Sequence, residues 1–454
     1  MNSKFFLLSL FILTLSGIIS QSFSVSVFLF LSLALGCIMV QELSPSNINR
    51  KELNDVYFIS FCVFVILTTI QWLGNDINAA FNVEENDQYR FWTASQSNGA
   101  SSLSMIYKEC IIDNIYIENG GYYLYIRTIA YFADHYLDGN HLLLQQLSSA
   151  VPGIYMSIFL YLIIYQFSSL GNVKKYAISA VLLTPLLTNS IGLHRDSLIA
   201  FLYVVIIYIW ICKPFNLRTV IVQLTLAFLM IYIREQHGFF AFSFVGLSLI
   251  SSRSSSSRFL YVIAVFVIFL ALGSSIIVNV IDNYKDTVAY YDAFRENALS
   301  GVNSGLGRHI YSLPTPLKQI TQILVLQMQF PPWAPLAAAT NFYYVITGLV
   351  ILAVNVFWFY VFIYTVFSIR RFGVKTIPFV IKLSLIVFIS FVVLNCSNLD
   401  LRRVVCVYPL LFLSYVYFRE NAANSLFNKN IRKIYSIVYS LLIVVYYSAT
   451  FIIK

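Results

Sequence analysis

Long apolar runs separated by short polar breaks fill most of the chain. The runs hold about 17–25 residues, the length at which a helix crosses the roughly 30 Å hydrocarbon layer of a bilayer. They predict an all-α, polytopic integral membrane protein with about 13 (11–14) transmembrane helices. The expected spans are 4–20, 22–40, 56–73, 147–167, 175–192, 197–212, 217–233, 237–250, 259–281, 342–368, 376–395, 403–418 and 433–452.

Two longer segments, 74–146 and 282–341, interrupt this pattern. Both are expected on the same side of the membrane, because an even number of predicted spans separates them. We therefore expect a single transmembrane helical domain over 1–454, with these segments as its two long loops. A protein with most of its non-membrane residues on one side is expected to act on something on that side.

The composition agrees with a membrane protein and excludes several other classes. Of the 454 residues, 59% are hydrophobic and only 11% are charged, whereas about 25% of the residues of a soluble domain are charged. A soluble enzyme, a secreted disulfide scaffold and a disordered protein are therefore excluded. The six cysteines show no spacing typical of metal ligands, so neither a zinc site nor a disulfide framework is expected.

Charge fixes the expected orientation. With a cytoplasmic N-terminus, the inner side holds 16 basic and 4 acidic residues, and the outer side holds 12 basic and 16 acidic residues. Because basic residues concentrate in short cytoplasmic loops, this orientation is the expected one, with both long loops outside. The net charge of +9 then reflects membrane topology, and nucleic acid is not an expected partner.

Three short outer turns carry unexpected charges, since such turns normally avoid arginine. They are 192–196 (GLHRD), 234–238 (REQHG) and 400–403 (DLRR). Ionisable groups at this depth tend to face a ligand or a protein cavity, and guanidinium binds phosphate bidentately. The turns predict a site for a lipid diphosphate made by Arg195, Arg234, Arg402 and Arg403. The alternative is structural, with ion pairs at helix ends and arginines that extend to the headgroups.

Residues for a saccharide are expected in the long loops. The first loop contains the acidic and aromatic stretch 84–92 (EENDQYRFW), in which Asp87 and Tyr89 are candidates to contact sugar. The second contains Trp333 in the segment 331–335 (PPWAP). The alternatives are an interfacial amphipathic helix for the first stretch, and a simple start of the next span for the second.

The pattern resembles the bacterial O-antigen and capsule repeat-unit polymerases of the Wzy type. The similarity lies in the hydrophobicity, the length and the long outer loops, and in short motifs. These motifs are 192–199 (GLHRDSLI), Ile233-Arg234-Glu235, Phe330-Pro331-Pro332-Trp333, and Arg402-Arg403 followed by Tyr408-Pro409. The doubled arginine departs from the family pattern and leaves open which of the two matches the family's residue.

The resemblance implies a glycosyltransferase without metal or cofactor at the periplasmic face of the bacterial inner membrane, with a fold similar to the GT-C type. It would transfer a growing glycan from undecaprenyl diphosphate to the non-reducing end of the next lipid-linked repeat. Its expected partners are that oligosaccharide, the bilayer, and a chain-length regulator and a flippase of the same pathway. The chemistry needs a general base for the attacking hydroxyl, for which Asp196, Glu235 and His237 are the candidates.

Other functions remain open from the sequence. A flippase for the same lipid-linked unit needs charges through the membrane, and only Lys382 lies clearly within a predicted span. An O-antigen ligase shares the many spans and a large outer loop. A polyprenyl-phosphate-sugar-dependent transferase has its acidic motif after the first span, whereas Asp87 follows the third. A transport or purely structural membrane protein is the remaining alternative.

Overall fold

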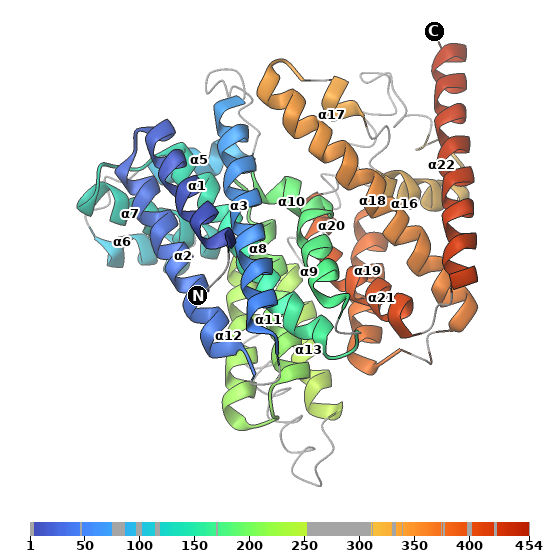
Figure 1. The fold of residues 1–454 in the computed structure, drawn as a ribbon, viewed down its shortest axis with the longest axis horizontal. Helices are drawn as coiled ribbons and strands as arrows, with labels where there is room; N and C mark the ends of the chain where they lie inside the picture. Colours follow the sequence, from blue (N-terminus) through green and yellow to red (C-terminus); the bar gives the residue numbers. More distant parts are fainter. Residues whose placement is uncertain are drawn as a thin grey trace.

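The described part of the chain is a helical bundle without a β-strand (Figure 1). The computed structural model describes residues 4–45, 48–74, 87–96, 102–113, 119–168, 171–251, 310, 312–328, 333–337, 339–373, 375, 377–396, 402–421 and 425–453. The helices before residue 252 are α1 (Lys4–Ser20), α2 (Phe23–Leu43), α3 (Arg50–Gly74), α5 (Asp87–Gln96), α6 (Leu103–Tyr107), the π-helix η1 (Lys108–Ile112), α7 (Gly120–Tyr136), α8 (Leu142–Tyr165), α9 (Val173–Leu182), α10 (Pro185–Ser190), α11 (Asp196–Cys212), α12 (Leu217–Ile233) and α13 (Glu235–Ser251). Those after it are α16 (Leu317–Met328), α17 (Ala334–Ala337), α18 (Phe342–Phe372), α19 (Phe379–Asn395), α20 (Arg402–Val405), α21 (Tyr408–Asn421) and α22 (Ser425–Ile453).

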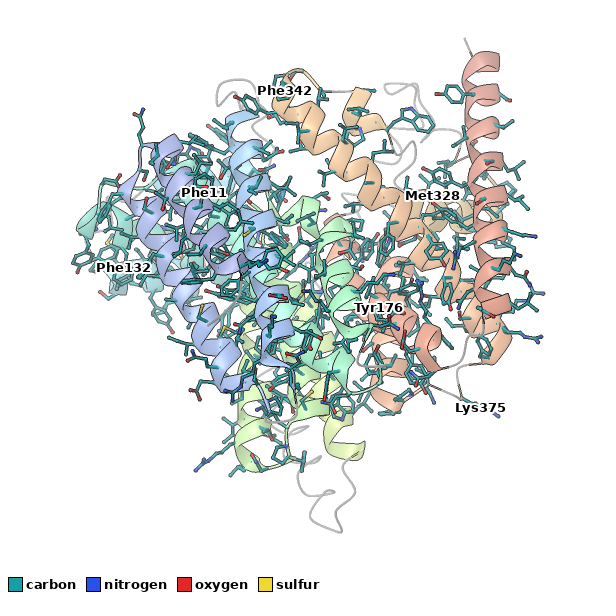
Figure 2. All side chains as sticks on the ribbon, in the orientation of Figure 1. Phe11, Phe132, Tyr176, Met328, Phe342 and Lys375 are labelled. Carbon is teal, nitrogen blue, oxygen red and sulfur yellow. The ribbon has the colours of Figure 1, made fainter. Side chains whose placement is uncertain are left out.

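Several helices have the properties of membrane spans. Among the described residues, α2, α3, α8 and α18 are long and apolar enough to cross a bilayer, and α1, α11, α12 and α19 are apolar but shorter. Large apolar side chains such as Phe11 and Phe342 point outward from the bundle, with 64% and 72% of their surface exposed (Figure 2). Because exposed apolar surface is unfavourable in water, these features are those of a helical membrane protein. The predicted span 259–281 lies outside the described residues.

Helix α8 forms the centre of the bundle. All its residues from Leu142 to Ile164 are buried, and it packs against α2, α3, α9 and α11. In Figure 1 the blue N-terminal helices and the orange-to-red C-terminal helices lie on opposite sides of this central group. A fully buried apolar helix needs other helices on every side, which the neighbouring spans provide.

Proline breaks two of the predicted spans into pairs of short helices. The predicted span 175–192 contains α9 and α10, which are separated just before Pro185. Proline lacks the amide donor that would continue the first helix and starts the second at its first position. The predicted span 403–418 likewise contains α20 and α21, with Pro409 in the first turn of α21.

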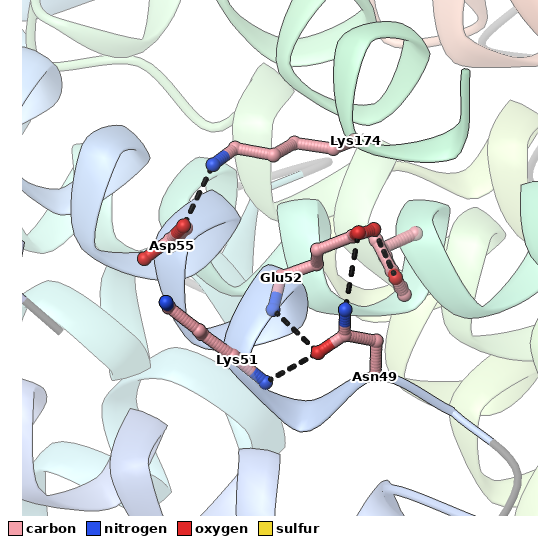
Figure 3. A network of polar contacts seen from close by, with 6 residues as sticks. Asn49, Lys51, Glu52, Asp55 and Lys174 are labelled. Carbon is pink, nitrogen blue, oxygen red and sulfur yellow. Dashed lines mark hydrogen bonds and ion pairs between the residues drawn. The ribbon is translucent and has the colours of Figure 1, made fainter. Parts of the chain in front are cut away.

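Charged side chains at one end of the bundle form a network (Figure 3). Lys174 Nζ lies 2.7 Å from Asp55 Oδ2, and the Tyr161 hydroxyl donates to Glu52 Oε2 at 3.2 Å. Two positions after Lys174, the Tyr176 hydroxyl donates to Glu420 Oε1 at 2.6 Å. The charge pattern assigned the four charged residues in these contacts, Lys174, Asp55, Glu52 and Glu420, to the inner side of the membrane. Residues that were predicted to lie on the same side of the membrane therefore contact one another. Which side is cytoplasmic stays a prediction.

Asp138 fastens the loop between α7 and α8 to the start of α2. Its carboxylate accepts hydrogen bonds from the backbone N–H groups of Phe23 and Ser24, both at 2.6 Å, and from the Ser24 hydroxyl. The first amides of a helix have no partner within the helix, so a carboxylate there stabilises it. Partial burial alone raises the pKa of Asp138, but these hydrogen bonds outweigh it and hold the pKa below its usual value of 3.8.

Replacing Asp138 by alanine is expected to destabilise the protein by about 1 kcal/mol at neutral pH, the usual cost of losing a helix cap. Folding lowers the pKa of this carboxyl, so its contribution is present above pH 3.8 and is lost as the pH falls through the folded-state pKa. Thermal unfolding in detergent between pH 3 and 7 measures this. Asp138→Ala should approach wild type at the acid end, and a constant difference at all pH values would contradict the assignment.

Candidate functional site

The turn between α10 and α11 holds the first charged cluster in a confined place. A Cβ on Gly192 would lie 3.1 Å from both Gln88 Oε1 and a carbon of the His194 ring, so this turn is packed from two sides. Asp196 begins α11 and is only 4% exposed, while Arg195 is half-buried. A carboxylate in the first turn of a helix is favoured by the helix dipole.

The second cluster lies at the corner between α12 and α13. Helix α12 ends at Ile233, Arg234 has an extended backbone, and α13 begins at Glu235. The Arg234 side chain is 13% exposed, and its Nη1 lies 3.8 Å from Asp196 Oδ1. Two charged turns that are 38 positions apart in the sequence, at 196 and 234, thus meet as a largely buried ion pair.

His237 lies deeper in the same corner and is fully buried. Its Nδ1 is 3.3 Å from the hydroxyl of Tyr203 in α11, and its Nε2 is 3.3 Å from Cys406 Sγ. The ring stacks on Phe391 of α19, with the centroids 4.3 Å apart. Both ring nitrogens therefore face protein groups.

The backbone of the third cluster lies next to this region. Helix α20, which begins at Arg402, packs against α10 and α11, and Cys406 follows it directly. The side chains of Arg402 and Arg403 and all of Asp400 lie outside the described part of the structure. The contacts of α20 and Cys406 bring this segment next to the other two clusters.

A helix from the first long loop contacts the first cluster. Helix α5 begins at Asp87, and the side chain of its second residue, Gln88, accepts a hydrogen bond from the Leu193 N–H at 3.2 Å. Asp87 is half-buried and Tyr89 is 36% exposed. The structure thus brings the candidate saccharide residues of this loop close to the charged turns.

Trp333 lies in a different environment. Its ring stacks on Tyr447 of α22, with the centroids 5.7 Å apart and the planes at 10°. Helix α22 packs along α18, on the side of the bundle formed by the C-terminal helices (Figure 1). The ring contact of Trp333 is thus with the C-terminal helices and not with the charged turns, and its assignment to a glycan site stays a prediction.

Three residues of this region were not identified from the sequence. Gln88, Tyr203 and Cys406 connect the charged turns, but each was taken as part of a loop or an apolar run. Tyr203 had a signal, because it follows Asp196 by seven positions and so lies on the same face of α11. The cysteine had none, since a buried cysteine in an apolar span is usually only a packing residue.

A hydroxyl chain anchors the first cluster to the bundle core. Ser197, next to Asp196, donates to the Ser149 carbonyl in α8, and the Ser149 hydroxyl lies 2.7 Å from the hydroxyl of Tyr122 in α7. Buried hydroxyls with partners fix the helices relative to one another. Within the described residues, no group of three or more His, Cys, Asp or Glu side chains is arranged to hold a metal ion.

Comparisons of the chain with protein-family models, with curated proteins and with solved structures found no match.

Proposed function

We propose that this protein is a polymerase of lipid-linked oligosaccharides, which acts at the outer face of a bacterial inner membrane. The observation that carries the proposal is the meeting of charged turns. Arg234 pairs with Asp196, the helix that carries Arg402 and Arg403 packs on α10 and α11, and α5 of the first long loop contacts Leu193. A cationic region beside apolar helices and under a long loop suits a ligand with a lipid tail, a diphosphate and a glycan.

The reaction joins two such ligands. A hydroxyl of the acceptor sugar attacks the anomeric carbon of the donor glycan, and the bond from that carbon to the diphosphate oxygen breaks. Undecaprenyl diphosphate leaves with the electron pair, and the base takes the hydroxyl proton. The developing negative charge is on the diphosphate, where preorganised arginines stabilise the transition state most.

The surroundings of the three base candidates differ. Asp196 is buried and paired with Arg234, so its role in the proposal is to hold that guanidinium in place. His237 is enclosed, with both ring nitrogens directed at Tyr203 and Cys406. Glu235 is half-buried at the first position of α13, directly after Arg234. We therefore assign the base to Glu235, because a base must reach the substrate hydroxyl.

Deletion of the gene tests this function through the surface polysaccharide of the cell. The expected result is a ladder reduced to lipopolysaccharide core, or its capsular equivalent, with a single repeat, and restoration by a plasmid that carries the wild-type gene. Core without any repeat would contradict polymerisation and point to flipping or ligation. An unchanged ladder would contradict any role in this polysaccharide.

A further inference from the structure

The buried residues Tyr203, His237 and Cys406 connect the three helical segments that carry the charged turns. Tyr203 is in α11, which begins at Asp196; His237 is in α13, three positions after Arg234; and Cys406 directly follows α20. All three side chains have essentially no exposed surface. Such a set is too enclosed to contact substrate, so its function must be exerted through its neighbours.

The hydrogen bonds of His237 define one arrangement of protons. The Tyr203 hydroxyl donates its only proton to the His237 carbonyl oxygen at 3.0 Å. The same hydroxyl oxygen can then only accept from Nδ1, at 3.3 Å, so Nδ1 carries the ring proton. Nε2 is left as an acceptor toward Cys406 Sγ at 3.3 Å, and the thiol donates to it. Each donor in the chain has one acceptor, and the ring is neutral.

The charged turns are joined directly to the hydrogen-bonded set Tyr203, His237 and Cys406, so the placement of their charged groups depends on this set. The His237 N–H donates to the Arg234 carbonyl oxygen at 3.0 Å, and the Arg234 guanidinium lies 3.8 Å from Asp196 at the start of α11. The ring of His237 is also held flat against Phe391. A shift of the imidazole would therefore move the α12–α13 corner relative to the start of α20.

We propose that His237 is a positioning residue and that its bond with Cys406 sets where α20 lies against the Arg195–Asp196 turn and Arg234. The inference rests on the proposed function, since it concerns how the arginines are assembled around a diphosphate. In it, the Cys406 thiol serves as a hydrogen-bond donor and not as a nucleophile. Misplacement of a charge-stabilising group by about 1 Å can lower the rate roughly 100-fold. The effect of losing this contact on the rate is therefore large enough to measure.

The test uses the purified full-length protein with Cys406→Ala, which removes the donor, and Cys406→Ser, which keeps one. The matched control is Cys62→Ala, because Cys62 is a buried thiol of α3 with its own hydrogen-bond partner, Ser9. Two quantities are measured: kcat for extension of lipid-linked repeats, and the Kd for farnesyl diphosphate, a short lipid diphosphate.

We expect Cys406→Ala to lower kcat about 10- to 100-fold and to weaken farnesyl diphosphate binding, while Cys406→Ser stays within about 3-fold of wild type. Cys62→Ala should change neither quantity more than about 3-fold, whatever it does to thermal stability. Wild-type kcat and Kd in Cys406→Ala, or equal loss in the serine and alanine variants, would overturn the proposal. If the wild type binds farnesyl diphosphate but extends nothing, the proposed function fails, while the Kd values still decide the positioning role.

Discussion

Arg234→Ala is expected to abolish long-chain polysaccharide in cells and to lower kcat of the purified protein by about 10²–10³-fold, the usual effect of removing one preorganised charge-stabilising donor. The Arg234 side chain is 13% exposed and faces the buried carboxylate of Asp196. Few water molecules can replace the guanidinium in such surroundings, so the developing charge on the diphosphate would lose its stabilisation. The buried carboxylate of Asp196 would also lose a counter-charge.

Two further variants separate charge from geometry. Arg234→Lys keeps the positive charge but not the planar pair of donors, so an intermediate loss of about 10-fold is expected. Arg218→Ala is the matched control, because Arg218 is an exposed arginine in the first turn of the same helix, at the end away from the site. The polysaccharide ladder and kcat are measured for all three. A wild-type ladder in Arg234→Ala cells would rule out the proposed role of this arginine.

Gly238→Ala is expected to give the largest loss of stability among single changes near the site, about 3 kcal/mol. A Cβ at this position would lie 2.8 Å from both the backbone N and the Cα of Ile231 in α12, and it would overlap the Ile231 side chain. Backbone atoms of a packed helix cannot rotate away as a side chain does. The added methyl group would therefore push α13 off α12 and open the corner that holds Arg234.

Gly246 provides the control for this substitution within the same helix. A Cβ on Gly246 would meet no atom within 4 Å, so Gly246→Ala should be neutral or stabilising by about 0.5–1 kcal/mol through the better helix propensity of alanine. Thermal unfolding in detergent compares the two variants. Similar midpoints for Gly238→Ala and Gly246→Ala would show that α12 and α13 are not packed as closely as described.

The apolar pattern was sufficient to predict where most helices lie. The predicted span 342–368 corresponds to α18, Phe342–Phe372, because no charged residue interrupts this run until Arg370. The start of α8 was predicted too late, at residue 147 instead of Leu142. Gln145 and Gln146 read as the end of a loop, yet both are buried. The side-chain amide of Gln145 donates hydrogen bonds to Asn140 Oδ1 and to the Ile126 carbonyl oxygen, which offset the cost of burying it. A hydropathy pattern does not reveal such partners.

The composition of the candidate site was easier to predict than its assembly. Arginine at three short outer turns violates a simple topological rule, so Arg195, Arg234 and the pair at 402–403 were conspicuous. Their proximity depends on how α11, α12, α13 and α20 pack, and the sequence of each helix alone contains no such information. The docking of α5 through Gln88 was unpredictable for the same reason.

The most direct measurement is extension of a lipid-linked repeat by the purified protein in lipid vesicles. Undecaprenyl-diphosphate-linked single repeats from a strain that lacks the gene serve as both donor and acceptor, and the products are resolved by mass. We predict glycans of two and more repeats, with release of one undecaprenyl diphosphate for each bond formed, and a loss of both products in Arg234→Ala. Folded wild-type protein that leaves every repeat single, in vesicles where the substrate is accessible, would contradict the proposed function.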